Sequence, residues 1–167
     1  MRKLLFYLLF FLSACLLSID FDSTRAQSST TVIKDEAAKQ MLLGEHRLSL
    51  QWVSWDYFGK ATVTDKNGQL FIQGEQKSRR GSDYLKIDGQ ITSVDTKEIK
   101  FKGTVLTQVS FLNNGNPCKR EGEMTFKITG NRKYWRLQEM NNPCDEAADY
   151  VDIYFRQPED SKSKKLR

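Results

Sequence analysis

The side chains that could perform chemistry in this chain are few, and they form no recognised catalytic motif. His46 is the single histidine, and the sequence contains no nucleophile-elbow, zinc-protease, phosphate-binding or dinucleotide-binding pattern. Catalysis would therefore depend on carboxylates such as Glu75, Asp88 or Asp152, whose separation in space the sequence does not give. We expect a protein that is not an enzyme. We expect His46 to be a hydrogen-bonded surface or rim residue and Asp152 to face solvent.

Three cysteines are present, at positions 15, 118 and 144. Cys15 lies in an apolar N-terminal segment, which leaves Cys118 and Cys144 as an even pair, and an exported chain most simply joins such a pair in a disulfide. With no Cys-x-x-Cys spacing and one histidine, the chain has no metal-ligand pattern. We expect no metal and no cofactor.

Aromatic side chains are the candidates for ligand binding. Trp52, Trp55 and Tyr57 cluster near the first expected turn, and Phe101 and Trp135 lie in later apolar segments. Aromatic walls with few polar groups suit small apolar ligands. The alternative role is core filling, which we favour for Trp52 and Trp135 because each is in phase with apolar neighbours.

Basic residues gather in expected turns. Arg79 and Arg80 follow one expected strand, and Arg132 lies in a later turn. Such residues are usually solvated loop tips, but together they could form a rim for an anionic headgroup.

The segment from Trp55 to Phe111 repeats one pattern four times. Gly59, Gly74, Gly89 and Gly103 are spaced by 15, 15 and 14 residues, within runs in which apolar and polar residues alternate. Alternation indicates strands with one buried face, and a glycine within a strand marks a bend, a bulge or a close approach of two backbones. The pattern predicts a strongly coiled antiparallel meander.

Eight strands are expected in total, and a short helix precedes them at residues 35–43 as a cover for one end of the sheet. The expected strands lie near residues 48–52, 55–63, 70–76, 84–94, 98–111, 124–128, 134–138 and 150–155. Eight antiparallel strands in sequence order suit a small closed barrel. A two-sheet β-sandwich is the alternative.

The domain organisation follows from composition. Residues 1–26 read as an export signal, residues 27–40 as a leader containing the start of the helix, 41–156 as a single β-barrel domain, and 157–167 as a disordered basic tail. Cleavage after Ala26 would give a secreted or periplasmic protein. Lipidation of Cys15 would instead anchor it at the outer membrane, and a membrane partner is expected only in that case.

Charge also limits the possible partners. The net charge is +5, and loss of three basic and two acidic residues with the signal lowers it to +4. This modest balance is not typical of a nucleic-acid-binding surface.

An exported chain with a short N-terminal helix, a glycine before the first strand, an eight-strand meander and one disulfide resembles the lipocalins. Lipocalins carry Gly-x-Trp at the start of the first strand, where this chain has Gly44-Glu45-His46. The resemblance implies a barrel that binds a small apolar or amphipathic ligand in its interior, and this is the function we expect. The alternative is an envelope or secreted module that binds a protein or polysaccharide through an exposed aromatic face, with Tyr150 and Tyr154 opposite the core side of the last strand.

Overall fold

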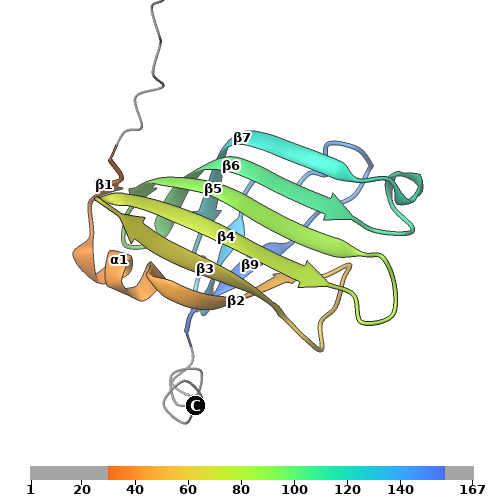
Figure 1. The fold of residues 1–167 in the computed structure, drawn as a ribbon, viewed down its shortest axis with the longest axis horizontal. Helices are drawn as coiled ribbons and strands as arrows, with labels where there is room; N and C mark the ends of the chain where they lie inside the picture. Colours follow the sequence, from red (N-terminus) through yellow and green to blue (C-terminus); the bar gives the residue numbers. More distant parts are fainter. Residues whose placement is uncertain (1–29, 157–167) are drawn as a thin grey trace, which may run out of the picture.

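Eight antiparallel strands close into a barrel in the computed structural model, which describes residues 30–156 (Figure 1). Each strand pairs with the next in sequence, and β9 pairs with β2 to complete the ring. The strands are β2 (Gly44–Leu50), β3 (Gly59–Lys66), β4 (Gln69–Lys77), β5 (Tyr84–Val94), β6 (Glu98–Gln108), β7 (Cys118–Lys127), β8 (Tyr134–Leu137) and β9 (Val151–Tyr154). Closure confirms the predicted barrel and excludes the two-sheet sandwich.

The expected leader, residues 27–40, contributes a strand to the fold as well as the start of the helix. A short strand, β1 (Val32–Ile33), pairs in parallel with the end of β5. Thr31 is buried, and its hydroxyl donates to the carbonyl oxygen of Ile91 (2.6 Å) and accepts from the amide of Leu70 (2.8 Å). The domain therefore begins before the expected boundary at residue 41. The predicted signal, Cys15 and the basic tail lie outside the described residues.

The predicted helix is confirmed as α1 (Glu36–Leu42). The Asp35 carboxylate caps its N-terminus by accepting from the amide of Ala38 (2.7 Å). Leu42 is fully buried against the barrel core, and Gly44 follows with φ of +104°, a conformation that suits glycine just after a helix. The helix therefore covers one end of the barrel, as expected.

Glycines occupy inward-facing positions where neighbouring strands approach most closely. A Cβ atom built on Gly74 would lie 2.6 Å from the Cβ of Ala61, and one on Gly59 would lie 2.2 Å from the carbonyl oxygen of Glu75. Both distances are far below a van der Waals contact. The absence of a side chain thus lets the sheet curl tightly enough to close.

The boundaries of the first two strands differ from the expected ones. The segment 51–58 is a loop, in which the Ser54 hydroxyl accepts from the amides of Asp56 (3.0 Å) and Tyr57 (3.2 Å). Local hydrogen bonds of this kind offer the backbone an alternative to the strand ladder. The loop contains Trp52, Trp55 and Tyr57, all three of which were expected in strands.

The barrel has two unlike ends (Figure 1). The helix end carries α1 and the short turns after β3, β5 and β7. The opposite end carries four longer connections, residues 51–58, 78–83, 109–117 and 138–150, and is called the loop end below.

Candidate functional site

The barrel interior is filled by side chains. A void of about 10 Å³ lies in this interior and is lined by Leu42 from α1 and by seven apolar side chains from the strands. A volume of this size is about what one water molecule requires. Phe101 and Trp135 are each 1% exposed within this core, so both side chains fill the interior.

His46 lies inside the barrel beneath α1 and not on its surface or rim, which corrects the expectation. It is 3% exposed, with Nε2 2.6 Å from the carbonyl oxygen of Leu42 and Nδ1 3.0 Å from that of Tyr154. Both neighbours are carbonyl oxygens, and a neutral imidazole donates to only one of them. Burial lowers the pKa of His46. The residue fastens the last helical carbonyl to the sheet and has no open side for a substrate.

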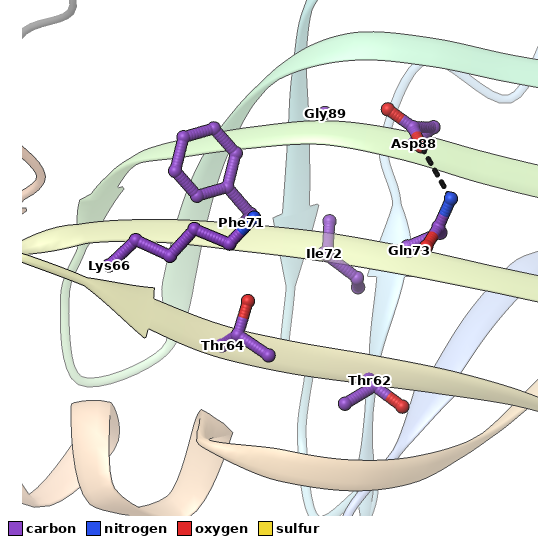
Figure 2. Close-up of a pocket in the computed structure, with 8 residues that line it drawn as sticks. All are labelled: Thr62, Thr64, Lys66, Phe71, Ile72, Gln73, Asp88 and Gly89. Carbon is purple, nitrogen blue, oxygen red and sulfur yellow. Dashed lines mark hydrogen bonds between the residues drawn. The ribbon is translucent and has the colours of Figure 1, made fainter.

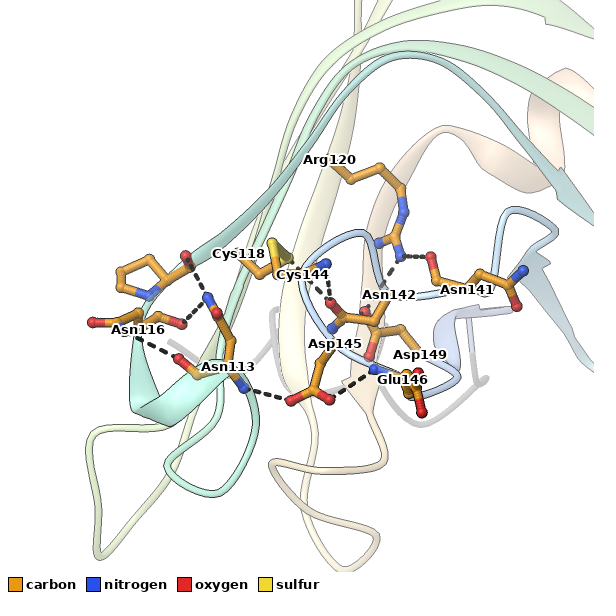
Figure 3. The surroundings of a disulfide bond; sticks show 11 residues. Asn113, Asn116, Cys118, Arg120, Asn141, Asn142, Cys144, Asp145, Glu146 and Asp149 are labelled. Carbon is orange, nitrogen blue, oxygen red and sulfur yellow. Dashed lines mark hydrogen bonds and ion pairs between the residues drawn. A yellow bond between two sulfur atoms is a disulfide. The ribbon is translucent and has the colours of Figure 1, made fainter.

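A buried polar network braces the loop end, and Asp149 is at its centre (Figure 3). Asp149 is 1% exposed. Its carboxylate accepts from the indole of Trp52 (3.1 Å), from Asn142 (3.0 Å) and from Arg120 (3.4 Å). A buried carboxylate with three donors of this kind is satisfied, and it holds strand β7 and two loops in one arrangement.

The predicted disulfide between Cys118 and Cys144 joins the start of β7 to the loop 138–150 (Figure 3). Asn142 accepts from the amide of Cys144 (2.8 Å). In the same loop Asp145 accepts from the amide of Asn113 (2.6 Å), which ties it to the loop 109–117. Three of the four loop-end segments are therefore linked by covalent or polar contacts.

The fourth segment, residues 78–83, is held by Tyr57. The Tyr57 hydroxyl accepts from the amide of Arg79 (2.9 Å), and the Arg79 guanidinium lies 4.2 Å from the Tyr57 ring. Buried Gln76 donates to the carbonyl oxygen of Tyr57 (3.0 Å) and accepts from the amide of Leu50 (2.7 Å). Through these contacts Tyr57 connects the loop 51–58 to β4 and to the segment 78–83.

Exposed aromatic side chains lie on this braced end. Trp55 is 59% exposed and Phe111 is 65% exposed. The half-buried Trp52 packs edge-on against Phe111, with ring centroids 5.9 Å apart. We call Trp52, Trp55 and Phe111 the loop-end aromatic surface. It holds two of the three large exposed hydrophobic residues in the described chain, the third being Val32 at the helix end.

The structure does not bring the three expected rim arginines together. Arg79 and Arg80 lie at the loop end, after β4, whereas Arg132 lies in the turn between β7 and β8 at the helix end. A common rim would require all three at one end of the barrel.

Asp152 is not exposed, which corrects a second expectation. It is 1% exposed and accepts two hydrogen bonds of 2.7 Å from Arg136 on the neighbouring strand β8. The guanidinium of Arg136 also lies 4.3 Å from the ring of Tyr150. Tyr150 and Tyr154 are half-buried in this outer layer, which covers Asp152 and removes it from solvent.

The remaining candidate carboxylates lie on the outer wall. Glu75 pairs with Lys77 (3.0 Å) and Lys86 (3.5 Å), and the hydrogen bond from Lys77 lowers the pKa of Glu75. Asp88 accepts from Gln73 (3.1 Å). A lowered pKa suits an ionised surface carboxylate and not a general acid.

Asp88 and Gln73 border an open hollow of about 430 Å³ on the outside of β3, β4 and β5 (Figure 2). Its edge includes the exposed hydroxyl side chains of Thr62 and Thr64, together with Phe71, over which Lys66 lies at 5.3 Å. The hollow is open, and its lining is both polar and apolar.

Within residues 30–156, no group of three or more histidine, cysteine or acidic side chains is placed to hold a metal ion. In the same range, no helix is long and apolar enough to cross a membrane. The disulfide indicates folding in an oxidising compartment.

Two features of this region were missed from the sequence. The expected strand near residues 98–111 would include Phe111, but β6 ends at Gln108 and the ring of Phe111 is exposed. Asp149 was given no role. A buried carboxylate has no local sequence signal, because its partners Trp52 and Arg120 are 97 and 29 residues away.

Fold and site together define a small, closed, disulfide-bonded antiparallel barrel with a filled interior and a braced loop end. The chain belongs to the PM1083 family, which matches residues 30–155. An uncharacterised protein, PM1083, of Pasteurella multocida (strain Pm70) is 43% identical over 114 residues, which cover 68% of this chain and 73% of that protein. No solved structure matches the chain. The matching family is not the lipocalins, so that resemblance is limited to the barrel and carries over no ligand.

Proposed function

We propose that this protein is an exported, non-enzymatic interaction module that binds a partner protein through the loop-end aromatic surface. The observation that carries this proposal is the exposure of Trp55 and Phe111 on loops that a disulfide and a buried polar network hold in place. Exposed aromatic residues on a rigid surface are typical of the residues that dominate protein–protein binding energy. A braced surface also loses little conformational entropy when it binds.

The compartment belongs to the same proposal. The disulfide requires an oxidising environment to form and persist, and the apolar segment at the N-terminus supplies an export signal. The periplasm or the extracellular space is therefore the proposed location. Attachment to the outer membrane through Cys15 is the alternative.

Binding of a small apolar ligand inside the barrel is the weaker candidate. A drug-sized ligand occupies a cavity of roughly 300 Å³ or more, compared with the void of about 10 Å³ in this core. Entry of a ligand would require α1 and several core side chains to move. Native mass spectrometry of the exported protein tests this candidate, since an interior ligand would appear as an added mass that is lost on unfolding.

Site-specific photo-crosslinking tests the main proposal. A benzophenone amino acid is placed at Trp55, at Phe111 and, as the matched control, at Val32, which is 57% exposed at the opposite end of the barrel. We expect positions 55 and 111 to give one shared, protease-sensitive adduct in the source cells and position 32 to give none. A protease-resistant adduct would indicate a glycan in place of a protein. Equal adducts from all three positions, or no adduct from any, would refute a loop-end docking surface.

A further inference from the structure

One arginine on the outer wall of the barrel, Arg47, has no acceptor among residues 30–156. The Arg47 guanidinium lies 4.8 Å from the ring centre of Phe58 and 5.7 Å from that of Tyr154. Its Nε atom is buried and makes no hydrogen bond, and no ion pair or hydrogen bond of its side chain occurs within residues 30–156. A guanidinium has five N–H donors, and buried donors in native proteins are nearly always satisfied. The Nε–H donor of Arg47 is therefore unsatisfied within residues 30–156.

A second unpaired cation lies directly opposite. Lys60 on β3 is the cross-strand partner of Arg47 on β2, and the two side chains share the outer face. Like charges at directly opposite positions destabilise a sheet. The Lys60 ammonium forms no ion pair in the described chain, because the carboxylate of its other cross-strand neighbour, Glu75, is engaged by Lys77 and Lys86.

The other nearby carboxylates do not neutralise the pair. Asp152 directs both oxygens to Arg136. Glu45, two residues before Arg47 on the same outer face, is exposed and forms no ion pair in the described range. Glu45 opposes the binding of an anion from a distance, but it leaves the two cations of the site uncompensated.

The surroundings of Arg47 favour an oxyanion with two negative charges. The rings of Phe58 and Tyr154 lie beside the guanidinium of half-buried Arg47, and the partial exclusion of water strengthens its attraction for an anion. The planar fork of arginine matches phosphate geometry, and a phosphate group carries close to two charges at neutral pH. We propose that Arg47 and Lys60 form a binding site for a phosphate group on the outer wall of β2 and β3, separate from the loop-end aromatic surface.

Nuclear magnetic resonance tests the site directly, with inorganic phosphate as the probe. In the full exported chain at pH 7, the Nε–H signal of Arg47 should shift on titration with phosphate and should shift much less with chloride at equal ionic strength. Lys60→Gln removes one exposed charge and should weaken binding by about fivefold. Arg47→Lys keeps the charge but loses the fork and should weaken binding by about tenfold.

Glu45→Gln is the matched variant of opposite sign, because removal of its negative charge should strengthen phosphate binding. An absence of any phosphate-dependent shift, or an equal shift with chloride, would overturn the proposal. So would an unchanged affinity in both Lys60→Gln and Arg47→Lys. None of these results depends on Trp55 or Phe111, so the phosphate-site proposal and the loop-end docking proposal are tested independently.

Vesicles distinguish the source of the phosphate. Binding to phosphatidic acid vesicles but not to phosphatidylcholine vesicles, with loss in Lys60→Gln, would support the site and identify a lipid headgroup. Phosphate binding in solution without vesicle binding would support the site and identify a soluble phosphate or phosphate monoester.

Discussion

Gly89 and Gly103 lie directly opposite each other on β5 and β6, and the ring of Phe101 covers both from inside the barrel. A Cβ atom on Gly103 would lie 2.6 Å from the Cα of Gly89, 2.6 Å from the Phe101 ring and 2.3 Å from the carbonyl oxygen of Asp88. Two of these three neighbours are backbone atoms and cannot move aside cheaply. The two glycines thus let a large aromatic side chain and a sharp bend share the same part of the wall.

Gly103→Ala should therefore lower the free energy of unfolding by about 2 kcal/mol or more, because overpacking against backbone forces the strands apart. Urea denaturation measures the change. The matched control is Gly81→Ala in an exposed loop, where the nearest atom is 3.5 Å from the new methyl group and little change is expected. An equal effect at the two positions would contradict the close-approach explanation.

Asp152→Asn should lower the free energy of unfolding by about 3–5 kcal/mol, because it leaves the half-buried Arg136 without its ionised partner. Thermal and urea unfolding both measure this. Glu121→Gln removes an exposed partner of Lys119 and should change stability by less than about 0.5 kcal/mol. A small effect at Asp152 would mean that its pair with Arg136 contributes little net stability.

Replacement of both Cys118 and Cys144 by alanine should cost about 3.5 kcal/mol, the value that the chain-entropy relation gives for a sequence separation of 26 residues. Denaturation of the wild type with and without reducing agent should show a similar loss. The double variant should not respond to the reducing agent. A response in the variant would show that the reductant acts elsewhere in the chain.

Stability should fall as the pH decreases below about 6.5, the ordinary pKa of histidine. Burial lowers the pKa of His46 in the folded state, so the unfolded chain binds the proton more tightly. The contribution of neutral His46 is therefore complete above the unfolded pKa and is lost as the pH falls toward the folded pKa. Urea denaturation at pH 7.5, 6.5 and 5.5 measures the trend.

His46→Gln serves as the control for this pH dependence, and its stability should be nearly independent of pH between 7.5 and 5.5. Glu75 and Glu98 have lowered pKa values because lysines donate hydrogen bonds to them. Their protonation therefore changes the stability only at a lower pH, below about 4.5. An unchanged pH dependence in His46→Gln would assign the effect to another group.

Trp52→Phe should destabilise the protein by about 1–2 kcal/mol, because buried Asp149 loses the indole N–H donor while the ring is largely retained. Trp55→Phe, at an exposed ring, should change stability by less than about 0.5 kcal/mol. If the two substitutions have equal effects, the Trp52–Asp149 bond does not brace the loop end.

Local sequence patterns predicted the order of the eight barrel strands, the helix, the disulfide and the glycine bends. Alternation of apolar and polar residues is a local consequence of strand geometry, and Asp35 caps α1 through an amide only three residues away. The bends at Gly74, Gly89 and Gly103 could be predicted from the sequence because one such glycine occurs in each strand at a nearly constant spacing.

The packing of distant segments determines which polar side chains are buried and which cations within residues 30–156 lack an ion-pair partner. Asp152 occupies an outward position in its strand, and it is buried because Arg136 on β8 binds it and Tyr150 in the adjoining loop packs against that guanidinium. Arg47 and Lys60 became neighbours through the register of β2 and β3. Such contacts depend on the register between strands, and the alternation of residues within one strand does not predict that register.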